Sequence, residues 1–245
     1  MRVEARRADL RRAFPQDLGQ RLTGARVTGL GRRAKYGLIH TDRNDTMVFH
    51  LGMSGSWRIN HAKLEKHDHL LLETDDGTRL SLNDPRRFGS VDLVPTDELG
   101  EWPPFRALGP EPLDISASEL KRRLDRRSAA IKLLLLDQRI IAGLGNIYVC
   151  EALFRAGIHP TRAGGSISLA RLERLVPAIR DVLADAIAAG GSTLRDFASP
   201  DGELGYFSNS FAVYDREGKA CDCGGNVRRI VQGGRSTFYC PKCQH

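Results

Sequence analysis

The last 25 residues hold four of the chain's five cysteines, as Cys221-x-Cys223 and Cys240-x-x-Cys243. Between these pairs the sequence predicts a two-stranded hairpin with its turn at Gly233-Gly234, which would bring the pairs together. Four thiolates at one point are the ligands of a tetrahedral zinc site, whereas a redox pair would not need a second pair of cysteines. The first pair is one residue shorter than a C-x-x-C knuckle, so its loop is tighter. We predict one structural Zn²⁺ that stabilises a hairpin too small to have its own core.

The net charge of +7 is concentrated in one part of the chain. From Lys121 to Arg139 there are seven basic and two acidic residues. Such a stripe is either a solvated helix face or the footprint of a protein that binds a phosphate backbone, and charge alone leaves both open. The chain is 41% apolar and has no apolar run that suits a membrane span or a secretory leader. We therefore expect a cytoplasmic, monomeric globular protein.

The order of the patterns predicts an α+β protein. Residues 1–100 indicate short β-strands, with a hairpin turn signal at Asp75-Asp76-Gly77. Residues 101–115 contain four prolines and are predicted to be a linker. Residues 116–210 are predicted to be helical, beginning with a capping box formed by Ser116 and Glu119. Residues 211–245 form the cysteine-bearing hairpin.

A glycine-rich turn, Gly143-Leu144-Gly145-Asn146, opens one of the predicted helices. The N-terminus of a helix presents N–H groups that favour a phosphate, but turn chemistry alone also explains the glycines. No strand–helix–strand unit surrounds them, as dinucleotide binding would require. Cys150 in this helix is expected to be a small buried hydrophobic residue. Arg235 at the hairpin tip is either a solvated turn residue or a phosphate contact.

Two loops of the strand region carry residues that are unusual in turns. Met53 lies between glycines in "HLGMSG", and Arg86 and Phe88 lie in "NDPRRFG". A methionine is usually a core residue, but a flexible apolar side chain matched with an Arg-x-Phe loop also suits insertion between stacked bases. The pair His67-x-His69 offers too few ligands for a good metal site, so we expect a phosphate contact or a structural hydrogen bond.

Taken together, these stretches resemble the bacterial formamidopyrimidine-DNA glycosylases. Matching segments keep the family's order from about Val3 onward, including "GRRAKYGL", "HLGMSGSWRI", "NDPRRFGSV", "IAGLGNIYVCEALFRAGIHP" and "VRRIVQGGRSTFYCPKCQ". The resemblance implies an N-terminal β-sandwich, a helix–two-turn–helix domain at 116–210 and a zinc finger at 211–245. It also implies a base-excision enzyme associated with the nucleoid. This enzyme would flip oxidised purines (8-oxoguanine and formamidopyrimidines) out of double-stranded DNA, remove them and nick abasic sites by β,δ-elimination.

The resemblance assigns roles by position. Lys35 would contact phosphate and donate a proton during β-elimination, and Arg235 would serve δ-elimination. Glu151 matches a position near the lesion pocket, and "SPDGELGYF" would close over the extruded base. Met53, Arg86 and Phe88 would fill the hole left by the flipped nucleotide. The remaining residues expected to bind DNA are His67, Arg127, Lys132 and Asn146.

The family's nucleophile is an N-terminal proline followed by glutamate, and its secondary amine forms a Schiff base with the sugar. No residue of this sequence matches that motif, and the family's first strand and first helix are missing as well. Two interpretations stay open: the true start lies upstream, or the chain is a truncated paralogue that binds damaged DNA without cutting it. In either case we expect the 245 residues alone to lack glycosylase and lyase activity.

Overall fold

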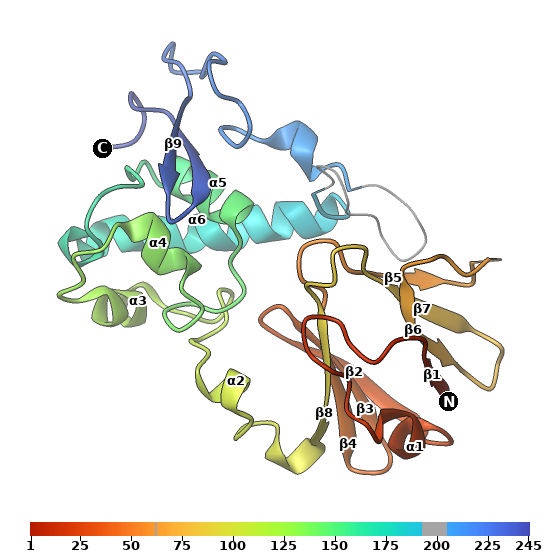
Figure 1. The fold of residues 1–245 in the computed structure, drawn as a ribbon. Helices are drawn as coiled ribbons and strands as arrows, with labels where there is room; N and C mark the ends of the chain where they lie inside the picture. Colours follow the sequence, from red (N-terminus) through yellow and green to blue (C-terminus); the bar gives the residue numbers. More distant parts are fainter. Residues whose placement is uncertain (62, 193–204) are drawn as a thin grey trace. The chain divides into compact units, whose positions relative to one another are not determined.

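A computed structural model describes residues 1–61, 63–192 and 205–245, which form two compact units (Figure 1). Unit 1 contains Met1–Arg106, and unit 2 contains Ala107–Gly191 and Tyr206–His245. Within the described residues, no helix is both long and apolar enough to cross a bilayer.

Unit 1 is built from two antiparallel four-stranded sheets (Figure 1). Short runs of β-branched, aromatic and leucine residues between turn residues account for these strands. The first sheet has the order β1 (Arg2–Ala5), β6 (Asp68–Glu73), β7 (Arg79–Asn83) and β5 (Ser56–Ile59). The second has the order β2 (Val27–Arg33), β3 (Tyr36–Thr41), β4 (Asp45–His50) and β8 (Ser90–Pro95).

The core of unit 1 lies between the two sheets. Leu70, Leu72 and Leu82 come from the first sheet, while Ile39 and Met47 come from the second. The short helix α1 (Leu18–Leu22) adds its two leucines to the same cluster. Because both sheets bury one face in a shared core, the prediction of a β-sandwich is confirmed.

The outer face of the second sheet is covered by residues that the sequence assigned to the linker. After β8 a 3₁₀ turn η1 (Thr96–Glu98) leads into α2 (Pro103–Arg106). Trp102 and Phe105 make edge-to-face contacts with Tyr36, at 5.7 and 5.4 Å between ring centroids. These rings pack against Leu38 and Val48 of the sheet. Residues 102–105 therefore belong structurally to the sandwich.

Unit 2 begins with helices and ends with the hairpin. Ser116 caps the first helix, since its Oγ accepts the Glu119 N–H at 3.1 Å. The elements in chain order are α3 (Ala117–Leu124), α4 (Ile131–Leu136), α5 (Asn146–Arg155), η2 (Gly164–Ser166), α6 (Leu169–Ala188), η3 (Phe207–Ser210), β9 (Arg228–Gln232) and β10 (Arg235–Tyr239).

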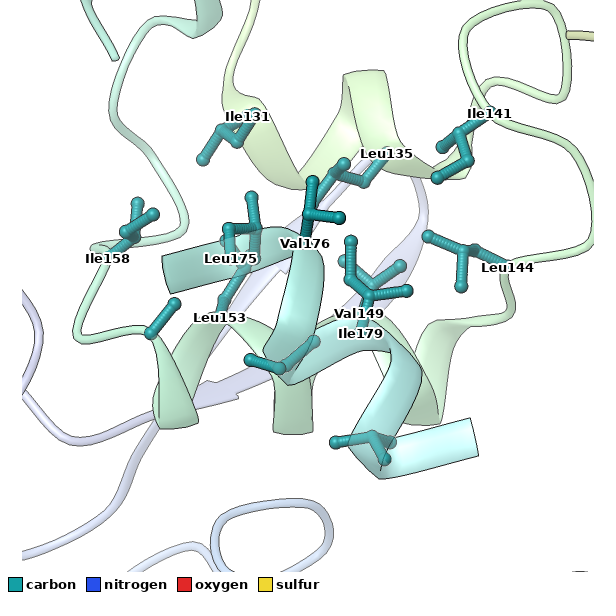
Figure 2. Packing of buried hydrophobic residues seen from close by; sticks show 14 of the residues in the cluster. Ile131, Leu135, Ile141, Leu144, Val149, Leu153, Ile158, Leu175, Val176 and Ile179 are labelled. Atoms are coloured by element: carbon teal, nitrogen blue, oxygen red, sulfur yellow. The ribbon is translucent and has the colours of Figure 1, made fainter. Parts of the chain in front are cut away.

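Aliphatic side chains from the helices α3, α4, α5 and α6 form the main core of unit 2, part of which is drawn in Figure 2. Leu135 of α4, Val149 of α5 and Val176 of α6 converge there, and each is almost entirely buried. The turn residues Ile141 and Leu144 close one side of the cluster. This core holds the first turn of α5 in place, and that turn contacts the hairpin.

Candidate functional site

The four cysteines of the tail form one cluster. Their sulfur atoms all lie within 4.8 Å of one another. The Sγ atoms of Cys221 and Cys243 are 3.7 Å apart, and those of Cys223 and Cys240 are 3.5 Å apart. A tetrahedral Zn²⁺ with Zn–S bonds of about 2.3 Å requires sulfurs about 3.8 Å apart, so the donor set fits the ion. The shorter C-x-C spacing therefore does not prevent Cys221 from joining the site.

Neighbouring residues hold both knuckles in shape. A Cβ on Gly225 would lie 3.4 Å from the sulfurs of Cys223 and Cys240, so a side chain there would crowd the metal position. Gln244 accepts the Cys240 N–H at 2.8 Å and donates to the Ile158 carbonyl at 2.9 Å. The second knuckle is thus fixed to the helical part of unit 2 as well as to its own hairpin.

The hairpin packs directly on helix α5. Phe238 of β10 and Val227 form a buried cluster with Cys150 and Val213. Burial raises the pKa of the Cys150 thiol, which keeps it protonated and unreactive. The prediction that Cys150 is a buried hydrophobic residue is confirmed.

Glu151, the next residue of α5, holds the backbone segment that leads into the zinc finger. Its carboxylate is fully buried and accepts N–H groups from Ala212, Val213 and Tyr214 at 2.8 to 3.0 Å. Three backbone donors satisfy an ionised carboxylate in place of water. In unit 2, Glu151 therefore joins the chain before the finger to helix α5.

Asn146 makes a similar connection at the start of α5. Its Nδ2 donates to the Ser236 carbonyl at 2.9 Å and to the Tyr214 hydroxyl at 3.2 Å. Ser236 follows Arg235, which is exposed at the tip after the Gly233-Gly234 turn. The contact therefore joins the backbone after Arg235 to the N-terminal turn of α5.

Lys132 of α4 is fully buried, and its Nζ has no hydrogen-bond partner among the described residues. Burial lowers its pKa below the ordinary value, and the nearby charge of Arg235 lowers it further.

Replacing Lys132 by methionine is expected to stabilise the protein by about 1 kcal/mol or more at pH 7, because it removes a buried charge that has no partner. The folded pKa lies below the unfolded one, so the unfolded chain binds more protons between them, and stability rises with pH in that window. Lys132→Met should lose this rise. Urea unfolding between pH 7 and 10 measures it, with exposed Lys66→Met as the control. Equal pH slopes for the wild-type protein and Lys132→Met would contradict the assignment.

The basic stripe is not a uniform face. Lys121 donates to two carbonyls of the 165–167 turn, Arg123 pairs with Glu119 at 2.9 Å, and Arg139 pairs with Asp137 at 2.8 Å. Four basic members of the stripe are exposed. Arg126 and Arg127 lie in the turn between α3 and α4, Arg122 lies at the end of α3, and Arg139 lies after α4.

In unit 1, the two unusual loops lie against each other. Met53 is 69% exposed and Phe88 is 45% exposed, although both are large apolar side chains. The guanidinium of Arg86 lies 4.8 Å above the Phe88 ring. A Cβ on Gly52 would lie only 2.6 Å from the backbone of Phe88, so the two loops touch backbone to backbone.

Lys35 lies at the same end of the sandwich. It is exposed in the turn between β2 and β3, where Tyr36 pairs with His50. Burial lowers the pKa of His50, and the charges of Lys35 and Arg11 lower it further. His50 in turn accepts the Gly52 N–H through Nδ1 at 2.9 Å. Lys35 is thus close to the loop that carries Met53.

The two histidines differ in their surroundings. His69 is buried and donates from Nε2 to the Asp84 carbonyl at 3.0 Å, and burial lowers its pKa. His67 is half-buried, with its ring 6.0 Å from that of His69. His69 therefore supplies a structural hydrogen bond, and His67 keeps part of its ring exposed.

Three family profiles match the chain in succession. Residues 1–91 match the formamidopyrimidine-DNA glycosylase N-terminal domain, residues 108–198 the formamidopyrimidine-DNA glycosylase H2TH domain, and residues 222–245 the zinc finger found in FPG and IleRS. A formamidopyrimidine-DNA glycosylase from Novosphingobium aromaticivorans is 69% identical over 245 residues, which cover 99% of this chain and 91% of that protein. The chain belongs to the formamidopyrimidine-DNA glycosylase family.

Solved structures of formamidopyrimidine-DNA glycosylases agree with this assignment. The Lactococcus lactis protein in complex with DNA containing an abasic site has a TM-score of 0.91 at 33% identity, covering 100% of this chain and 91% of that one. The Thermus thermophilus protein has a TM-score of 0.88 at 39% identity, covering 99% and 90%. The expected fold and family are confirmed.

Most residues assigned from the formamidopyrimidine-DNA glycosylase resemblance fall into two groups. Lys35, His67, Met53, Arg86 and Phe88 lie in unit 1, and the last three are on touching loops. Lys132, Asn146, Arg235 and the four cysteines lie around the finger in unit 2. Arg127 is separate, in the turn after α3. Most of "SPDGELGYF" lies outside the described residues.

The motif comparison missed residues that support these groups. A pocket in unit 1 is lined by Arg11, Arg12 and His50 together with Phe88. Beneath the two loops lie Ser54 and the fully buried Asp84. Asp84 belongs to the segment "NDPRRFG". Its burial depends on the strands β7 and β8, so the turn motif alone does not reveal it.

Proposed function

We propose that the protein is a base-excision DNA glycosylase that acts on oxidised purines, such as 8-oxoguanine and formamidopyrimidines, and on abasic sites in double-stranded DNA. The observation that carries this proposal is the exposed pair Met53 and Phe88 on two adjoining loops, with Arg86 stacked on the phenyl ring. Large apolar side chains are rarely left exposed together without a partner surface. A gap in a base stack is a partner of the right chemistry.

Extrusion of a nucleotide explains why such a pair is needed. A base inside a duplex must leave the stack before its glycosidic bond can be cleaved, and this costs a few kcal/mol. Apolar side chains that enter the gap restore part of the lost stacking, and basic residues hold the flanking phosphates. Exposed Arg127 and Arg235, and half-buried His67, suit phosphate contacts.

The roles in strand cleavage are proposals from the family resemblance. Lys35 donates a proton during β-elimination, and its exposure in the β2–β3 turn leaves it accessible to DNA. Arg235 serves δ-elimination from the finger tip. Asn146 supports the finger through its hydrogen bond to the Ser236 carbonyl, and we propose that it acts on DNA through the position of the neighbouring Arg235. Lys132 is assigned to DNA binding by the resemblance alone. Acting on chromosomal DNA, such an enzyme associates with the nucleoid.

We further propose that the 245 residues alone bind damaged duplex without cleaving it. They contain no match to the family's N-terminal Pro-Glu motif. The Met1 ammonium donates to the Ala25 carbonyl at 3.1 Å. This hydrogen bond holds the α-amine of the polypeptide against the backbone that follows α1. A non-catalytic module that recognises damaged DNA is therefore the second candidate function.

The proposed function predicts stronger binding to damaged than to intact duplex. At moderate salt, the affinity for a duplex with an abasic-site analogue should exceed that for the intact duplex by about tenfold or more. Lys35→Ala should weaken binding to both by a few-fold, since it removes a phosphate contact. Fluorescence anisotropy measures both constants. Arg26→Ala is the matched control, because Arg26 is exposed at the opposite end of β2. Equal affinity for damaged and intact duplex would overturn the proposal.

A further inference from the structure

The carboxylate of Asp84 lies beneath the two loops that carry Met53 and Phe88. It is fully buried at the end of β7. Its Oδ1 accepts the Ser54 hydroxyl at 2.7 Å, and its Oδ2 accepts the Gly89 N–H at 2.8 Å. One carboxylate therefore binds the residue after Met53 and the residue after Phe88.

Ser54 completes the connection. Its hydroxyl is buried and, besides donating to Asp84, accepts the Arg86 N–H at 3.2 Å. The loop of Ser54 is itself closed by a hydrogen bond from the Gly55 N–H to the Leu51 carbonyl at 2.9 Å. The residues that follow Met53 and Phe88 are therefore both hydrogen-bonded to Asp84. The Arg86 amide is hydrogen-bonded to Ser54.

The backbone of Asp84 is also fully engaged. Its N–H donates to the His67 carbonyl at 3.0 Å, and its carbonyl accepts from Arg87 N–H at 3.2 Å and from His69 Nε2 at 3.0 Å. Gly89 cannot carry a side chain, since a Cβ there would lie 2.9 Å from the His50 carbonyl and 3.0 Å from Asp84 Oδ2. The sandwich thus holds the carboxylate in one place. Its hydrogen bonds to Ser54 and Gly89 in turn fix the positions of both loops.

We propose that Ser54 and Asp84 are positioning residues that fix Met53 relative to Phe88, so that both enter the base stack as one preformed wedge. The exposed side chains have little packing of their own, so their spacing depends on the backbone beneath them. Preorganisation of this kind lowers the entropy cost of ordering the loops on binding. This inference rests on the proposed function, because it presumes that the wedge inserts at a damaged site.

The test is Ser54→Ala, which removes the hydroxyl and adds no new atoms to the buried site. We expect its affinity for a duplex with an abasic-site analogue to fall about tenfold, the equivalent of one buried hydrogen bond to a charged group. Affinity for intact duplex of the same sequence should stay within about twofold, because backbone contacts do not need the wedge. In a Met53→Ala background, Ser54→Ala should cost little more, since both changes disable the same insertion.

Thr41→Val is the matched control. It removes one buried hydroxyl that donates to the Asp45 carbonyl at 2.8 Å, at the opposite end of β4 from Met53. It should leave the ratio of damaged to intact affinity unchanged. A 2-aminopurine base opposite the abasic site gives a second readout, because wedge entry changes its stacking and its fluorescence. Wild type and Thr41→Val should show this change, and Ser54→Ala should reduce it.

The outcomes separate the two proposals. If wild-type protein prefers damaged duplex and Ser54→Ala keeps that preference, or if Ser54→Ala weakens both duplexes equally, the positioning role is overturned. If wild-type protein shows no preference, the proposed function is overturned. Hydrogen exchange without DNA tests separately whether Ser54 and Asp84 hold the two loops together. Ser54→Ala should speed exchange of the Arg86 and Gly89 amides. Unchanged exchange at these amides would contradict the positioning role regardless of DNA binding.

Discussion

Borohydride is expected to trap no covalent adduct between a protein of these 245 residues and a duplex that contains 8-oxoguanine. The family resemblance implies that a terminal proline amine forms the Schiff base, and no residue here matches it. The Met1 ammonium donates to the Ala25 carbonyl, and Arg2–Ala5 continue as the edge strand β1. This amine is therefore engaged within the sandwich. A denaturing gel resolves free DNA from any adduct.

The same protein preceded by a Pro-Glu segment like that of the family is the matched positive control, and it should form the adduct. Anisotropy binding to an abasic duplex shows that each preparation is folded and competent. If the 245 residues alone gave an adduct, peptide mass spectrometry would identify the attached amine. Attachment at Met1 or at a lysine would refute the expected inactivity.

Replacing Cys240 by serine is expected to lower the affinity for an abasic duplex by about 100-fold or more. Binding of zinc in small finger peptides supplies about 10–16 kcal/mol, and this energy becomes folding energy. Most residues of β9 are at least partly exposed, so the hairpin has little core apart from the contacts of Val227 and Phe238 with α5. Without the metal, the Asn146–Ser236 contact and the position of Arg235 would be lost.

Cys150→Ala is the matched control for this experiment, since Cys150 lies outside the four-sulfur cluster. It should keep one equivalent of zinc and most of the affinity. Metal content by mass spectrometry and anisotropy binding are measured on the same samples. A Cys240→Ser protein that kept full affinity would show that the finger is not required for binding.

The parts of the structure set by local sequence were predictable. The spacing of the four cysteines predicted the metal site, because thiolate pairs on a hairpin have few other uses. Ser116 and Glu119 marked the start of α3, since capping involves residues only a few positions apart. The glycine pair at the hairpin tip placed Arg235 correctly, because that turn requires positive φ at both positions.

Contacts between distant segments were not predictable. Lys132 belongs to a basic stripe in the sequence, but its side chain is fully buried in the structure. The sequence also gave no sign that Glu151 accepts hydrogen bonds from the backbone amides of residues 212–214. Trp102 and Phe105 lie among prolines that favour a linker, but their rings pack on an apolar face of the second sheet. No single stretch of sequence contains both sides of these contacts.

The position of Cys150 gives the protein an internal chemical reporter. Its thiol lies under the hairpin, where Phe238 covers it, so an alkylating reagent can reach it only when the hairpin separates from α5. The four metal-binding sulfurs become reactive when the ion departs, which is a different event. Counting labelled thiols over time, in the presence and absence of a chelator, would therefore distinguish a finger that has lost its metal from a finger that has detached as a whole.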